Sequence, residues 1–150
     1  MSDMTATQAR EAADRFAIHE LLVEYGRTID NRDWDGLGAL FGEDGLYVAG
    51  SGEGVKGAAV GPLMKDIFAR NPSNWREPNF HVFFNEVIRI TGPDAATASS
   101  LSLFVTPGDN GGAAMVGIVG EYEDELVRDG GRWRFARRVV KGHIHARHSR

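Results

Sequence analysis

The sequence contains no cysteine and no run of 18 apolar residues. The first absence excludes a disulfide framework, a zinc-thiolate cluster and a thiol nucleophile, and it fits a cytoplasmic protein. The second argues against a transmembrane helix. With 42% hydrophobic and 25% charged residues among 150, the composition favours one globular domain over 1–150, with ends frayed at about 1–8 and 142–150.

Basic side chains are scarce in the first 127 residues, which contain 9 of them against 20 acidic ones. Residues 128–150 reverse this balance, with 8 basic and 1 acidic side chains. Such a cluster can bind nucleic acid. Because most of it falls on a strand pattern in a protein of net charge −4, we interpret it as a solvated strand face. We therefore expect no nucleic-acid and no membrane partner.

Apolar residues in the first part of the chain recur with helical spacing. Over 7–29 the pattern predicts an amphipathic helix. Asp33 can cap a short second helix, and a third is expected over 58–70, before Pro72. The apolar stripe of the first helix consists of Ile18, Leu21, Leu22, Tyr25 and Ile29.

After residue 78 the period of the apolar pattern changes from 3.6 to 2, which predicts strands. A short strand is also expected over 46–48. Tight turns rich in glycine and proline separate the later strands, so we expect successive antiparallel hairpins over 79–90, 95–106, 113–127 and 132–141. The fold class is therefore α+β: helices packed on one face of a strongly curved, mainly antiparallel sheet, with a concave interior suited to a small ligand.

Gly52, Gly54 and Gly57 have the spacing of a dinucleotide-binding fingerprint. That motif requires a parallel strand–helix–strand unit. The tight turns downstream join antiparallel strands instead, so we interpret these residues as turn glycines and predict no cofactor.

His81 lies in an apolar strand, Asn79 to Asn85, both faces of which we expect to be largely covered. A buried histidine is either a core residue with satisfied hydrogen bonds or a catalytic base. The residues alone favour the core interpretation.

Asp30 directly follows the first helix, where the helix dipole disfavours a carboxylate. It is either a turn acid or the partner of a cation or histidine. Arg138 alternates with Ala136 and Val140, on the opposite parity from Phe135. On a packed strand, Arg138 either meets a buried anion or extends to the rim.

Two tyrosines and three histidines complete the candidates. Tyr25 and Tyr47 fall on a helix face and on the first strand, where a phenol either fills the core or enters a site. The tail residues His143, His145 and His148 could bind a metal, but we interpret them as a frayed terminus and predict no metal site.

Together these residues resemble the SnoaL-like branch of the nuclear transport factor 2-like (NTF2-like) superfamily, with its cystatin-like cone fold. Within that branch the chain is most similar to scytalone dehydratase and its relatives. The motifs that carry the resemblance are Tyr25-x₄-Asp30-x₂-Asp33-Trp34-x₂-Leu37-x₂-Leu40-Phe41, Phe80-His81-x₃-Asn85, and Gly120-x-Tyr122 leading to Gly131-Arg132-Trp133-Arg134-Phe135.

The resemblance implies a catalytic set. Asp30 and His81 match a pair that removes a proton from the substrate, Arg138 matches an arginine of the dehydrochlorinase-like members, and Tyr25 matches a tyrosine of the bile-acid type. Tyr47 lies two residues before the first-strand tyrosine position. The chain departs from scytalone dehydratase in lacking a tyrosine directly before Asp30 and a second histidine near the end of the next strand.

The resemblance thus implies a cofactor-free lyase of the dehydratase type that acts on a small hydrophobic or polycyclic substrate. Two alternatives stay open: proton transfer like that of ketosteroid isomerase, and a non-catalytic small-molecule-binding or oligomerisation module. Relatives commonly form dimers or trimers, so we also expect a homo-oligomer.

Overall fold

The computed structural model describes residues 5–50, 52–109 and 112–146. Within these residues the chain forms helices and strands that agree in kind and order with the sequence patterns, apart from the additional short strand β2. The elements are α1 (Ala6–Asp30), α2 (Trp34–Ala39), β1 (Phe41–Ala49), β2 (Val55–Lys56), α3 (Gly57–Arg70), β3 (Phe80–Gly92), β4 (Ala95–Pro107), β5 (Ala114–Asp129) and β6 (Arg132–His145).

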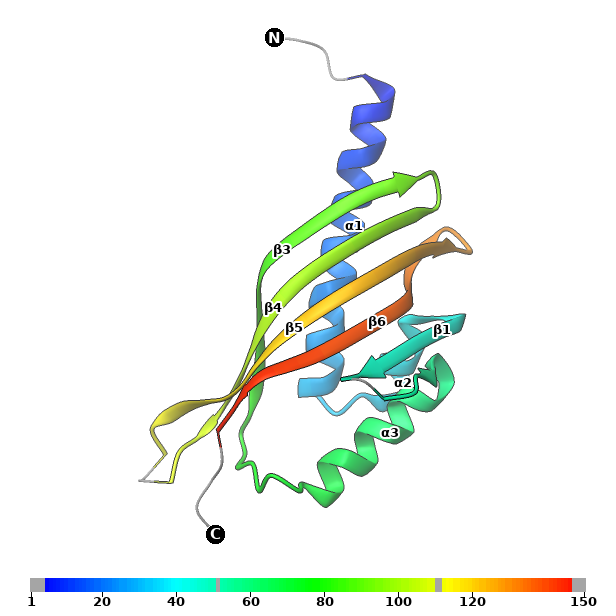
Figure 1. Cartoon of the computed structure of the whole chain (residues 1–150). Coiled ribbons are helices and arrows are strands. Elements are labelled where there is room, and N and C mark those ends of the chain that lie inside the picture. Colours follow the sequence, from blue (N-terminus) through cyan, green and yellow to red (C-terminus); the bar gives the residue numbers. More distant parts are fainter. Residues whose placement is uncertain (1–4, 51, 110–111, 147–150) are drawn as a thin grey trace.

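The strands form one curved sheet in the order β2-β1-β6-β5-β4-β3. The run from β3 to β6 is a meander of long antiparallel hairpins, as predicted, whereas β1 pairs with β6 in parallel. Figure 1 shows the long strands bending around α1, with α3 below the sheet. The fold is therefore α+β with a mixed, mainly antiparallel sheet.

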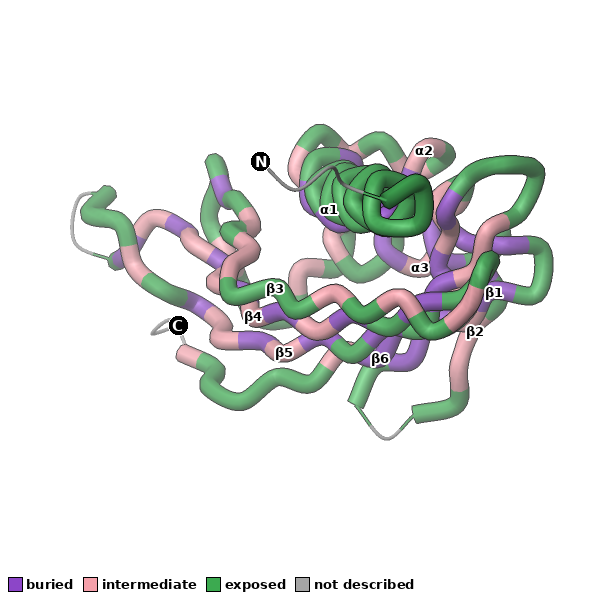
Figure 2. Tube along the Cα trace, turned by 90° about the horizontal axis from the view of Figure 1, so that it is seen from above, coloured by how far each residue is buried: buried purple, intermediate pink, exposed green. Residues whose placement is uncertain are grey.

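All three helices lie on the same side of the sheet (Figure 2). Of these described helices, none combines the length and apolarity needed to cross a membrane. The other face of the sheet is open, so Phe80 and Val82 are 53% and 48% exposed. The prediction that both faces of the strand containing His81 are covered is therefore wrong, because the helices cover only the inner face.

The core forms where α1 packs on the sheet. The predicted stripe of α1 is buried, with Ile18 and Tyr25 among its least exposed side chains. Along β4 burial alternates, and its inward positions from Ala96 to Ser102 carry only alanine and serine. These small side chains leave room for the large aromatic residues that α1, β3 and β5 direct into the same space.

A bulge in β6 decides which way Arg138 points. Arg137 pairs with Glu125 while Phe135 pairs with Leu126, so Ala136 is an extra residue in β6. A bulge of this kind reverses the alternation of side chains beyond it. Arg138 therefore faces inward like Phe135, although strict alternation predicted opposite faces.

A second bulge has the same effect in β3. Between the pairs Phe84–Leu101 and Val87–Ser99, the two residues Asn85 and Glu86 oppose one residue of β4, and Asn85 has a φ of 52°. His81 therefore faces the core side before the bulge, and Ile88 does so after it. Because of the bulge, β3 contributes His81 to the pocket and Ile88 to the main core.

Parts of the two segments that we expected to be frayed, about 1–8 and 142–150, have regular secondary structure. Thr5 caps α1 in a reciprocal capping box with Gln8, and β6 continues to His145. Within the described residues, the segments expected to fray are thus partly ordered by a cap and by pairing with β5.

Candidate functional site

Asp30 and His81 form a hydrogen-bonded pair where α1 ends and β3 begins. Oδ1 of Asp30 lies 2.7 Å from Nδ1 of His81, and the backbone N–H of His81 donates to both carboxylate oxygens at 3.1 Å. The side chains are only 17% and 13% exposed. These donors offset the unfavourable field that a helix C-terminus exerts on a carboxylate. Of the two interpretations left open for Asp30, the one with a histidine partner therefore fits the structure, and the partner is His81.

The pairing also determines which ring nitrogen of His81 is free. A carboxylate only accepts hydrogen bonds, so Nδ1 carries the proton donated to Asp30, and Nε2 of the neutral ring holds a lone pair. Phe83 stacks on the imidazole with centroids 6.2 Å apart, and Phe104 packs on it at 5.0 Å. His81 therefore has the geometry of an oriented base.

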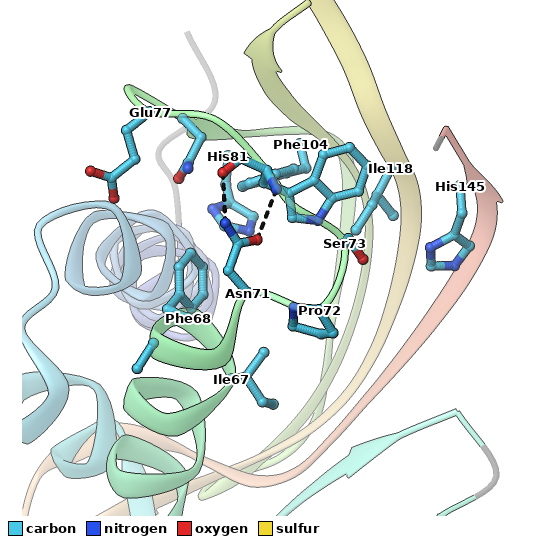
Figure 3. A pocket seen from close by; sticks show the side chains of 13 residues that line it. Ile67, Phe68, Asn71, Pro72, Ser73, Glu77, His81, Phe104, Ile118 and His145 are labelled. Atoms are coloured by element: carbon cyan, nitrogen blue, oxygen red, sulfur yellow. Dashed lines mark hydrogen bonds between the residues drawn. The ribbon is translucent and has the colours of Figure 1, made fainter. Parts of the chain in front are cut away.

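A pocket of about 470 Å³ opens beside His81. Its walls come from the end of α3, from the segment 71–79 and from the inner sheet face (Figure 3). This volume suits a drug-sized molecule. The lining side chains are Ile67, Phe68, Ala69, Asn71, Pro72, Ser73, Trp75, Glu77, Asn79, His81, Phe104, Ile118 and His145.

The segment after α3 is fixed as one wall of the pocket. Asn71 adopts a left-handed conformation at the end of α3, and its side chain makes two 2.8 Å hydrogen bonds with the backbone of Trp75. The indole packs edge-on against Phe104, 5.6 Å away. A Cβ at Gly117 would lie 2.9 Å from the Trp75 ring, so the glycine allows this close approach.

Arg32 contacts three parts of the site, and no sequence pattern singled it out. Its Nη2 donates to Glu77 Oε1 and Asn79 Oδ1, each at 2.9 Å, and its guanidinium lies 4.2 Å from the Phe68 ring centroid. It also holds a φ of 59° two residues after Asp30. Arg32 thus links the end of α1, the wall formed by α3 and the approach to β3.

Arg138 lies deeper in the cone, fully buried among aromatic rings. Its guanidinium carbon is 3.9 Å from the ring centroid of Tyr25, 4.2 Å from that of Tyr122 and 4.5 Å from that of Phe135. Desolvated cation–π contacts of this kind are favourable. The side chain does not extend to the rim.

The buried anion beside Arg138 is Asp124, a residue not among the candidates predicted from the sequence. The two residues pair across β5 and β6, with Nη1 3.4 Å from Oδ2. Burial raises the pKa of Asp124 to about 6, and the Arg138 charge opposes this rise. The only signal in the sequence is that Asp124 shares the parity of Tyr122 and Leu126 on β5.

Tyr25 and Tyr47 are buried beside Arg138, and their side chains are hydrogen-bonded to each other. The side chain of Tyr25 is also hydrogen-bonded to that of Tyr122. Burial raises the pKa of each of these phenols, so they stay protonated at neutral pH. We call Arg138, Asp124 and these three tyrosines the Arg138 cluster. Its members do not line the pocket, whereas His81 does.

The described tail histidines differ from one another. His143 Nε2 lies 2.8 Å from Oε2 of Glu121, while His145 lines the pocket at the end of β6. In Figure 3 His145 lies on the far side of the pocket from His81. His148 lies outside the described residues. The alternating pattern His143-Ile144-His145 was the signal that the strand continues.

The glycine run at 52–57 adopts no dinucleotide-binding arrangement. β1 pairs with β2 antiparallel immediately before α3, so the parallel unit that the motif requires is not formed there. Within residues 5–50, 52–109 and 112–146, no group of three or more histidine, aspartate or glutamate side chains is arranged to hold a metal ion.

Close relatives in sequence come from mycobacteria. Uncharacterized proteins from Mycobacterium bovis and from two strains of Mycobacterium tuberculosis are each 30% identical to this chain over 142 residues. The similarity covers 91% of this chain and 90% of each relative.

Solved structures share the fold at lower identity. An NTF2-like protein with a cystatin-like fold from Novosphingobium aromaticivorans has a TM-score of 0.79 at 24% identity, covering 97% of this chain and 94% of that one. A candidate scytalone dehydratase from the same organism has a TM-score of 0.74 at 20% identity, and the match covers 93% of this chain and 91% of that one. Hexachlorocyclohexane dehydrochlorinase LinA-type3 from Novosphingobium barchaimii has a TM-score of 0.75 at 19% identity, and the match covers 91% of each chain.

The family model of the SnoaL-like domain matches residues 10–139. This range includes Asp30, His81, the pocket segment 71–79 and Arg138, and it agrees with the NTF2-like, cystatin-like architecture of the structural neighbours. The chain belongs to the SnoaL-like domain family.

Proposed function

We propose that this protein is a cofactor-free lyase of the dehydratase type, acting on a small hydrophobic or polycyclic molecule bound in the pocket. The observation that carries the proposal is the 2.7 Å hydrogen bond between Asp30 and His81 at the wall of a pocket of about 470 Å³. Two structural neighbours also support a lyase, because their names denote elimination reactions: a candidate scytalone dehydratase and a dehydrochlorinase.

In the proposed reaction His81 is the base. Its Nε2 removes a proton from a carbon next to a carbonyl, and the Asp30 carboxylate stabilises the imidazolium that forms. The electron pair of the broken C–H bond becomes the new double bond as the C–O bond breaks. The departing hydroxyl then takes a proton from the imidazolium, so water leaves and His81 returns to the neutral ring.

The lining favours an apolar substrate that is flat or polycyclic. Aromatic and aliphatic side chains form most of the walls, and no lysine or arginine is among the lining residues described. Such walls exclude water from the reacting carbon and strengthen the electrostatic effect of the Asp30–His81 pair.

The proposal also gives roles to the Arg138 cluster, as the family resemblance implies. Arg138 would stabilise the developing negative charge, and Tyr25 or Tyr47 would donate a hydrogen bond to the departing hydroxyl while keeping its proton. Phe83 lies between this cluster and His81, in contact with both. For Arg138 and the tyrosines to act in this way, a group of the substrate must extend from the pocket past the Phe83 ring.

The first experiment uses 3-hydroxy-1-tetralone, a bicyclic β-hydroxy ketone whose dehydration yields fluorescent 1-naphthol. We expect turnover by the wild type and a loss of at least about 100-fold in His81→Gln, with the fold retained. In parallel, the base is tested without a leaving group by following deuterium uptake at C2 of 1-tetralone in heavy water. Deuterium uptake without 1-naphthol formation would instead favour isomerase-like proton transfer.

His19→Gln is the matched control, because His19 also pairs with a carboxylate, Glu86 at 2.6 Å, but lies on the exposed side of α1. It should leave both reactions unchanged. If the wild type catalyses neither reaction, or if His81→Gln is as active as the wild type, the proposal is wrong and a binding module is favoured. The expected homo-oligomer stays a prediction that sedimentation velocity tests.

A further inference from the structure

The interior of the cone contains buried polar atoms that make no hydrogen bond within the described residues. They are all three guanidinium nitrogens of Arg138, both carboxylate oxygens of Asp124 and Oγ of Ser100. The 3.4 Å approach of Arg138 to Asp124 is a contact of charges without hydrogen-bond geometry. Because buried polar groups in proteins are nearly always hydrogen-bonded, the five atoms of this ion pair, with Ser100 on the neighbouring strand β4, mark a place for a polar partner.

The charges of this site define what it binds. The Arg138 cation is paired with the Asp124 carboxylate, so the pair gives a permanently anionic ligand little net attraction, although Arg138 can still stabilise charge that develops beside it during the reaction. A neutral hydroxyl can bind to both partners at once, because its oxygen accepts from the guanidinium and its hydrogen is donated to the carboxylate. The aromatic rings around Arg138 favour an apolar carrier for that hydroxyl.

Phe83 is the side chain between this site and the pocket. Its ring stacks on His81 at 6.2 Å, and its centroid lies 5.8 Å from the guanidinium carbon of Arg138. On the helix side, a Cβ at Gly26 would lie 2.9 Å from Phe83 Cε2, so the ring occupies space left by a glycine. Phe83 is therefore the ring that separates the pocket from the polar atoms behind it.

We infer that Arg138, Asp124 and Ser100 form a binding site for a neutral hydroxyl of the molecule held in the His81 pocket, reached when the Phe83 ring turns aside. The inference rests on the proposed function for placing the ligand in that pocket. It deepens the proposal by naming the substrate class: a hydroxylated apolar ring compound, not a carboxylate.

The test compares the binding of 2-naphthol and naphthalene at pH 8, where Asp124 is charged. An apolar pocket without a polar partner binds naphthalene at least as tightly as 2-naphthol, since the hydroxyl must lose its hydration. We expect the wild type to bind 2-naphthol at least tenfold more tightly. In the Arg138→Met/Asp124→Leu double variant, which replaces the ion pair by apolar side chains of similar size, the preference should disappear while naphthalene affinity is kept.

Two further measurements keep the test decisive if the double variant fails to fold. Ser100→Ala should lower the preference about threefold, and the Arg138 Nε–H resonance of the wild type should shift with 2-naphthol but not with naphthalene. A preference that is absent in the wild type, or that survives in the double variant, overturns the inference. His81→Gln should keep the preference, so loss of catalysis with intact selectivity separates this site from the proposed chemistry.

Discussion

The imidazole of His145 lies against Gly142, three residues earlier in β6, in space that any side chain at position 142 would fill. This relationship keeps the ring at the wall of the pocket that also contains His81. A glycine in an exposed strand position usually weakens the strand. Here its lack of a side chain determines where a polar pocket residue lies.

Gly142→Ala should therefore displace His145 and weaken ligand binding without unfolding the protein. We expect a stability change within about 0.5 kcal/mol, because the position is exposed. The affinity for 2-naphthol should fall by the same factor as in His145→Ala, and the double variant should be no worse than either single variant. His143→Ala is the control. Additive losses would show that Gly142 does not act through His145.

Asp30→Asn should allow the wrong tautomer of His81. The amide can donate to Nδ1, so the proton can move to Nε2 and the base is lost. We expect activity to fall about 100- to 10,000-fold with little loss of fold. The ¹⁵N shifts of the His81 ring, measured in both proteins, report the tautomer directly. Identical shifts would mean that Asp30 does not orient the ring.

Arg32→Ala should loosen the pocket wall and lower activity through position alone. The variant loses hydrogen bonds to Glu77 and Asn79 and the contact with Phe68, so we expect a loss of about 1–2 kcal/mol in the free energy of unfolding. Activity should fall mainly in kcat, with a change in the His81 Nδ1 proton resonance. Arg27→Ala, on an exposed arginine of α1, is the control. Unchanged kcat in Arg32→Ala would limit Arg32 to a structural role.

Asp124 should make stability decrease as the pH rises. Burial raises the pKa of this carboxyl in the folded state from 3.8 to about 6, so between these values the folded state binds more protons than the unfolded state. A shift of roughly two units corresponds to about 3 kcal/mol, which is present below pH 4 and lost above pH 6.

Urea unfolding at pH 4, 6 and 8 measures this dependence. The stability of the wild type relative to Asp124→Asn should decrease with pH across this range, by up to about 3 kcal/mol. Asp129→Asn is the control, because that carboxylate is exposed and belongs to the same strand, β5. A difference between wild type and Asp124→Asn that is the same at every pH would contradict the raised pKa.

The local sequence was sufficient for the elements, whereas the Asp30–His81 pair was predicted only through the family resemblance. The helical stripe from Ile18 to Ile29 and the alternating strands after residue 78 determine helices and hairpins, because burial periodicity is a local property. Asp30 stood out because a carboxylate at a helix C-terminus needs a partner. The prediction of a concave interior followed from the order of the elements.

Tertiary structure alone decided which polar residues meet. Alternation placed Arg138 on the wrong face, since the extra residue Ala136 has no signature in the sequence, and the pairing with β5 creates the bulge. Asp124 and Arg32 were missed because their partners are distant in sequence. His145 was interpreted as part of a frayed terminus, although it lines the pocket. Periodicity determines which face of an element is apolar, but only the packing of the sheet against α1 and α3 brings His81 to a pocket and leaves Arg138 and Asp124 together behind Phe83.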